Sequence, residues 1–127
     1  MSADPGTGAP AGHRWGRAQE AAAQIIDRGH LRRFTRDAAF EREVLELFRA
    51  HVPASLARLR SSRGRSFRDA AHAIKGSAAA IGAWRLAHAA ERAESGDGDD
   101  PAAREEAIAA VCAAAAEICR HIAESAG

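Results

Sequence analysis

The sequence predicts an all-α protein, an antiparallel up-down-up-down four-helix bundle with one or two short extra helices at its N-terminal end. Hydrophobic residues make up 46% of the 127 residues, but many of them are alanine, which favours helices and fills little volume. Aromatic residues are only 5%, so closely packed helices suit this composition better than a sheet. Apolar residues also recur at spacings of three and four between short polar segments, which indicates amphipathic helices joined by short loops.

The N-terminal part of the chain predicts little regular structure before the bundle begins. Residues 1–16 combine prolines and glycines with almost no aliphatic side chains, so they are expected to be a flexible segment. Residues 17–127 are then the bundle domain. A short helix is expected at 19–27, where Gly29 interrupts it, and a helical turn at 31–34.

The first long helix is expected to begin after Asp37, whose short acidic side chain suits an N-cap. Its apolar residues recur at helical spacing over about six turns. They are Phe40, Val44, Leu47, Phe48, Val52, Leu56 and Leu59. Pro53 lies within this helix and removes one backbone donor, so a kink is expected there.

The second long helix follows a loop at 61–64. Ser66 and Asp69 fit a capping box, which predicts Ser66 as the N-cap of the helix and Asp69 at its third position. Gly82 is expected to end the helix. The apolar face of the helix comprises Phe67, Ala71, Ile74, Ala78 and Ile81.

Two further helices complete the predicted bundle. One spans 84–95 and is rich in alanine, and a polar turn at 96–100 follows it. Asp100 and Pro101 are a strong start signal for the last helix, with the acid as N-cap and the proline at the first helical position. The apolar row of that helix comprises Ile108, Val111, Ala115, Ile118 and Ile122.

The charge and cysteine content limit the functions and the cellular compartment that are expected for the chain. Eighteen basic and 17 acidic residues leave a formal net charge of +1, which gives no case for nucleic-acid binding. Cys112 and Cys119 are seven residues apart, a helical rise of about 10.5 Å, so no disulfide is expected and the compartment is taken as reducing. No apolar run of 18 residues or signal-peptide core is present. These features predict a cytoplasmic protein without a membrane span. A monomer is expected because a small bundle with short loops can bury its core without a second copy.

The chemistry of the chain is expected at His72, which is followed by Lys75 and Gly76. A helical wheel centred on Phe67 places His72 about 140° away, on the solvent side of its helix. Residues three and four apart share a helix face, so the imidazole lies beside a fixed positive charge and a position without a side chain. An exposed histidine of this kind usually has no function, and its neighbours are what raise the probability of one.

Each neighbour has a physical use in phosphoryl transfer. A neutral imidazole, with an unperturbed pKa of about 6.5, is a nucleophile at physiological pH. Lys75 can stabilise the charge of a transferred phosphoryl group. Gly76 costs about 1 kcal/mol in a helix interior relative to alanine, so clearance beside the imidazole explains it best. His72 and Lys75 are therefore the candidate catalytic residues.

Four residues are candidates for contact with a protein partner. Gly76 and Ala79 keep the surface beside His72 low. Arg65 and Arg68 lie on the same side of the helix and can attract an acidic partner surface.

From about residue 31 to residue 94 the chain resembles the histidine-containing phosphotransfer (HPt) domain family of two-component phosphorelays. The segments that carry the resemblance are residues 71–78 (AHAIKGSA), residues 81–83 (IGA), Leu86, Glu91, and an upstream Phe40 followed by residues 45–48 (LELF). The motifs cover about half of the chain, and the block from His72 to Gly82 is the most specific part. The alanine-rich helix after Gly82 offers no identifiable second residue that would contact the phosphate.

The resemblance implies a specific function and partners. His72 would accept a phosphoryl group from the aspartyl phosphate of a response-regulator receiver domain and pass it to another receiver. Lys75 would stabilise the phosphohistidine, and Gly76 would clear the docking surface. The chain itself would need no cofactor, whereas Mg²⁺ is expected on the partner receiver. A hybrid histidine kinase is a further expected partner. The chain has no recognisable ATP-binding domain, so it would be a relay intermediate rather than a turnover enzyme.

Two other functions compete with this one. A non-catalytic helical docking module could bind and inhibit a receiver or a histidine kinase, and a metal site could use His72 and His88. The remaining histidines are expected to be structural or functionless. His51 is expected to be partly buried and His88 exposed, His121 lies near a helix C-terminus, and His13 and His30 lie in flexible or loop regions. Trp84 is expected to be a core anchor.

Overall fold

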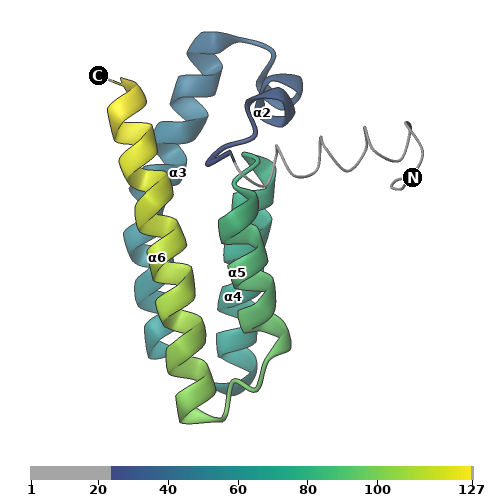
Figure 1. The fold of residues 1–127 in the computed structure, drawn as a ribbon, viewed down its shortest axis with the longest axis vertical. Coiled ribbons are helices and arrows are strands. Elements are labelled where there is room, and N and C mark those ends of the chain that lie inside the picture. Colours follow the sequence, from purple (N-terminus) through teal and green to yellow (C-terminus); the bar gives the residue numbers. More distant parts are fainter. Residues whose placement is uncertain (1–23, 127) are drawn as a thin grey trace, which may run out of the picture.

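The computed structural model describes residues 24–126, and within them it contains five helices and no strand. These are α2 (Arg28–Thr35), α3 (Ala38–Ser61), α4 (Gly64–Ala80), α5 (Trp84–Ser95) and α6 (Pro101–Ala126). The four longer helices run antiparallel to their chain neighbours, and α2 lies at one end of them (Figure 1). Each of the four packs against two others, α4 on α3 and α5, and α6 on α5 and α3. The predicted all-α four-helix bundle with a short extra helix is confirmed.

The helix starts follow local capping chemistry. The Asp37 carboxylate accepts a hydrogen bond from the backbone N–H of Phe40 at 3.2 Å, as its predicted N-cap role requires. The last helix begins at Pro101, and the carbonyl of Asp100 accepts its first backbone bond, from Arg104, at 2.9 Å. The starts predicted from these two acids are confirmed.

The short helix predicted at 19–27 is wrong over residues 24–27, the part of it that the structure describes. Residues 24–26 form a bend, and Gly29 lies inside α2 instead of ending a helix. The cause is Asp27, which has extended backbone angles and accepts a hydrogen bond from the backbone N–H of His30, so it opens a helix at Arg28. Residues 1–23, including His13, lie outside the described part.

The predicted capping box at Ser66 is also wrong. The helix α4 begins at Gly64, with Arg63 as N-cap, and the N–H of Phe67 already bonds the Arg63 carbonyl at 3.2 Å. Gly64 has a φ of 55°, and this left-handed backbone turns the chain into the helix before Ser66 is reached.

The core lies between the four long helices and contains mostly small and branched side chains. Its largest fully buried members are Phe67, Leu31, Leu59, Leu86, Ile118 and Val111. The whole predicted apolar row of α6 is buried, and so is that of α4. On α3, however, Phe40 and Leu47 are exposed, which corrects the prediction for that face. Leu45 faces the core instead, and it lies about 140° from Phe40 and about 160° from Leu47 around the helix.

The connection between α4 and α5 requires a glycine. Gly82 has a φ of 76°, and a Cβ there would lie 2.9 Å from the backbone oxygen of Asp27. The close approach allows the Asp27 N–H to donate to the Gly82 carbonyl at 2.9 Å. The Trp84 indole N–H also donates to the Asp27 carboxylate at 3.0 Å, and this bond lowers the pKa of Asp27. His30 packs edge-on against Trp84 and lies in α2, not in the predicted loop.

Candidate functional site

The His72 imidazole lies on the solvent-facing side of α4, as the helical wheel predicted, and its side chain is 66% exposed. Its Nδ1 lies 2.8 Å from Oε2 of Glu94, which comes from α5. The Lys75 ammonium forms an ion pair of 2.9 Å with the other carboxylate oxygen of Glu94. One carboxylate thus joins the histidine and the lysine of α4 into a three-residue cluster.

The contact with Glu94 selects one tautomer of neutral His72. A carboxylate oxygen can only accept a hydrogen bond, so the Nδ1 that contacts it carries the hydrogen. In the neutral ring the lone pair then lies on Nε2. Within residues 24–126, Nε2 has no hydrogen-bond partner. The arrangement therefore presents the nucleophilic nitrogen of an exposed imidazole to an incoming molecule.

The ion pair favours the charged forms of both Glu94 and Lys75. The Lys75 ammonium, and then the His72 hydrogen bond, hold the pKa of Glu94 below its usual value. Glu94 in turn raises the pKa of Lys75. Because the carboxylate pKa is depressed, the contribution of the pair to stability is complete at neutral pH and disappears as the pH falls through that pKa.

The structure brings together the predicted residues Arg65, Arg68, His72 and Lys75 around one shallow hollow. It also places in that hollow a set of residues that were not among the predicted site residues. These are Asp69, Glu91, Glu94 and Ser95. Three acidic side chains therefore accompany the three basic ones, and the predicted basic strip is balanced by charges that come mainly from α5.

Gly76 opens the surface on the other side of His72. A Cβ at this position would meet nothing within 4 Å, apart from the backbone of its own helix. Ala73 and Ala80 are exposed on the same side of α4, and Ala79 is half-buried. Small residues therefore form a low strip that begins at the imidazole.

The low strip leads to an apolar groove of about 370 Å³ between α3 and α4. The α3 residues Leu47 and Phe48 and the α4 residues Ile74 and Ser77 line it, and Phe34 of α2 contributes at one side. Phe34 and Leu47 are among the large hydrophobic side chains that remain exposed in the described part of the chain. This groove explains why the apolar row of α3 is wider than the core requires.

Glu94 is the site residue that sequence reasoning missed. The alanine-rich helix offered two acids, Glu91 and Glu94, and nothing local distinguishes them. Only the register of α5 against α4 shows that the residue 22 positions after His72 reaches its imidazole. Counting residues on both sides of Gly82 could have placed Glu94 at about the height of His72 along the bundle. It could not have shown that Glu94 lies on the face of α5 that points toward His72.

The other predicted positions have mixed outcomes. His51 is exposed, which corrects the prediction of partial burial, and its Nδ1 lies 2.8 Å from the Leu47 carbonyl. His88 is exposed as predicted. Cys112 and Cys119 are free thiols and half-buried, and burial raises the pKa of Cys119.

No cluster of three or more His, Cys, Asp or Glu side chains suited to a metal ion occurs within residues 24–126. Over the same residues, no helix is long and apolar enough to cross a membrane.

The family model of the Hpt domain matches residues 43–121. The chain therefore belongs to the Hpt domain family, whose members carry out histidine phosphotransfer in two-component signalling and interact with receiver domains and kinases. No curated protein and no solved structure matches the chain.

Proposed function

We propose that this chain is a reversible phosphorelay intermediate. His72 accepts a phosphoryl group from the aspartyl phosphate of a response-regulator receiver domain and passes it to another receiver. The observation that carries this proposal is the hydrogen bond between Nδ1 of His72 and the Glu94 carboxylate, because it leaves Nε2 as the free nucleophile on an exposed ring.

In the proposed step, the Nε2 lone pair attacks the phosphorus and the bond between phosphorus and the aspartate oxygen breaks. The aspartate leaves as a carboxylate, and the Nδ1 proton stays on the ring. The ring therefore gains positive charge as the N–P bond forms, and the Glu94 carboxylate at 2.8 Å is placed to offset it. Transfer to a second receiver is the reverse of this step.

Lys75 supplies the positive charge near the phosphoryl oxygens. It lies one turn from His72 and is held by Glu94 at 2.9 Å before transfer. Its ammonium has three donors, so it can bond a phosphoryl oxygen while it retains the contact with the carboxylate. Positioned charge of this kind is the main contribution that a protein makes to phosphoryl transfer.

The receiver is proposed to dock over the low strip and the apolar groove. Phe34 and Leu47 supply exposed apolar area, and Gly76 allows the partner backbone to approach the imidazole. Arg65 and Arg68 would meet acidic side chains around the aspartate, where the receiver also holds its Mg²⁺.

The direct test is transfer from a panel of receiver domains carrying radiolabelled aspartyl phosphate. A labelled protein whose label is stable in base, labile in acid and located on the peptide containing His72 is the expected result. A folded protein that binds receivers but takes no label from any of them would overturn the proposal in favour of a docking module.

Replacing Glu94 with glutamine is expected to slow phosphorylation of His72 by about tenfold or more, since outer partners of a functional imidazole typically have effects of this size. The neutral amide no longer fixes the Nδ1–H tautomer or offsets charge on the ring. Nitrogen-15 NMR of the imidazole should show a mixture of tautomers, and single-turnover transfer measures the rate. Glu91→Gln is the matched control, because Glu91 lines the same hollow without contacting His72. Equal rates in the two variants would contradict the role of Glu94.

Replacing Gly76 with glutamine is expected to weaken receiver docking by about tenfold while the protein becomes no less stable. The new side chain has room on the helix but stands in the path of the partner. Gly76→Ala is the control, and it should raise the free energy of unfolding by about 0.5–1 kcal/mol because alanine is the better helix former. Titration calorimetry with a receiver and urea unfolding measure the two effects, and unchanged affinity of Gly76→Gln would exclude docking at this strip.

A further inference from the structure

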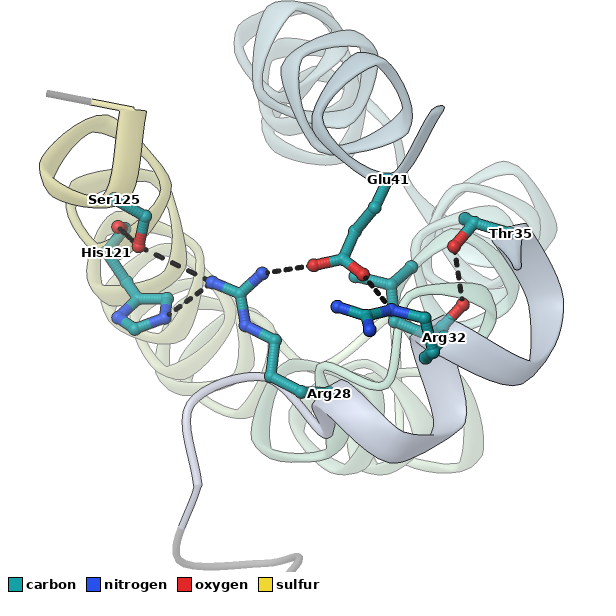
Figure 2. Close-up of polar contacts among 7 residues, drawn as sticks. Arg28, Arg32, Thr35, Glu41, His121 and Ser125 are labelled. Atoms are coloured by element: carbon teal, nitrogen blue, oxygen red, sulfur yellow. Dashed lines mark hydrogen bonds and ion pairs between the residues drawn. The ribbon is translucent and has the colours of Figure 1, made fainter. Parts of the chain in front are cut away.

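The short helix α2 is held against the bundle by one buried acid. Glu41 of α3 is only 7% exposed, and its two carboxylate oxygens pair with different arginines of α2. Arg28 donates from Nη1 to Oε2, and Arg32 donates from Nε to Oε1, each at 2.9 Å (Figure 2). Both carboxylate oxygens of Glu41 therefore help to orient α2.

The network continues from α2 to the last helix. The second guanidinium nitrogen of Arg28 lies 3.3 Å from Nε2 of His121 and 3.4 Å from the Ser125 hydroxyl, both on α6 (Figure 2). Arg28 therefore bridges α3 and α6 across the end of the bundle. This contact fixes α2 relative to two long helices at once.

Polar contacts matter here because α2 has little else to hold it. It has eight residues, too few for a stable isolated helix, and only Leu31 and Thr35 are buried within it. Leu31 anchors one side of the helix in the core, and Asp27 secures its start. The two ion pairs with Glu41, together with the Arg28 contacts to α6, oppose rotation of α2 about these anchors.

The orientation of α2 determines where Phe34 lies. Phe34 is 58% exposed and lines the apolar groove together with Leu47 and Phe48 of α3. It is two residues from Arg32, which Glu41 holds directly. We propose that Glu41 is a positioning residue that sets the affinity for the receiver by holding Phe34 at the groove, without touching the receiver itself. This inference rests on the proposed function.

The test is a double-mutant cycle read from the concentration dependence of single-turnover transfer. Glu41→Gln and Phe34→Ala are each expected to raise the half-saturating receiver concentration by about tenfold and to leave the limiting rate unchanged. The double variant should be no weaker than Phe34→Ala, because without the phenyl ring its position no longer matters. Glu43→Gln, exposed on the same helix, is the control.

Several outcomes would overturn this role. The half-saturating receiver concentration of Glu41→Gln could be the same as that of the wild type, or its limiting rate could fall. Alternatively, the effects of Glu41→Gln and Phe34→Ala on the half-saturating concentration could add fully in the double variant. If Glu41→Gln does not fold, Arg32→Gln replaces it, since that variant leaves the acid paired with Arg28. Failure of the wild type to take label on His72 would instead overturn the proposed function, so the two failures are distinguishable.

Discussion

Replacing His72 with glutamine is expected to abolish phosphorylation by receiver domains, a loss of at least about a thousandfold, because the variant has no nitrogen lone pair to attack phosphorus. The amide of glutamine can still donate to Glu94, so the rest of the cluster is retained. The side chain is exposed and is not part of the core. The free energy of unfolding should therefore change by no more than about 0.5 kcal/mol.

The control for this experiment is His88→Gln, because His88 is also an exposed helical histidine. It should be phosphorylated like the wild type, and circular dichroism should show the same helix content in all three proteins. Label that remains in His72→Gln would mean that another residue is the acceptor, and equal loss in His88→Gln would point to a general effect on docking.

Replacing Phe67 with alanine is expected to lower the free energy of unfolding by about 3–5 kcal/mol, the largest stability change among the substitutions considered. Phe67 is 1% exposed and is the largest of the fully buried side chains. Ala70 and Ala71 lie one helical turn along α4 from it, and Ala93 of α5 lines the same hollow. Their short side chains cannot extend into the cavity that the substitution leaves.

Phe40→Ala provides the comparison, because Phe40 is a phenylalanine that is 45% exposed on α3. It should lower the free energy of unfolding by about 1 kcal/mol or less. Urea unfolding followed by circular dichroism measures both variants. Similar losses at the two positions would mean that the end of the bundle near Phe67 is more loosely packed than the structure indicates.

Most of the fold could be predicted because the signals are local. Caps such as Asp37 and the pair Asp100 and Pro101 act within one helical turn, and apolar spacing identified the core faces of α4 and α6. Helical spacing misassigned Phe40 and Leu47 because periodicity measures how wide an apolar face is, not which part of it is covered. At Ser66 the left-handed backbone of Gly64 started the helix earlier than the capping signal.

The site was predictable on one helix and not on its neighbour. His72, Lys75 and Gly76 lie within five residues, so one wheel places them. Glu94 reaches the site only through the packing of α5 on α4, and Glu41 is buried only because α2 supplies two guanidinium groups. Such pairings depend on the three-dimensional register of helices, which no single periodicity contains.

The tight turn at Gly82 also has a consequence for the order in which the molecule folds. It joins α4 to α5 directly, so His72, Lys75 and Glu94 all lie within one helical hairpin and only 22 residues separate the bonded pair. Contacts between residues close in the chain form quickly, because little loop entropy is lost when they meet. We therefore expect the three side chains to meet as soon as this hairpin forms, while the groove, which needs α2 and α3, is completed later.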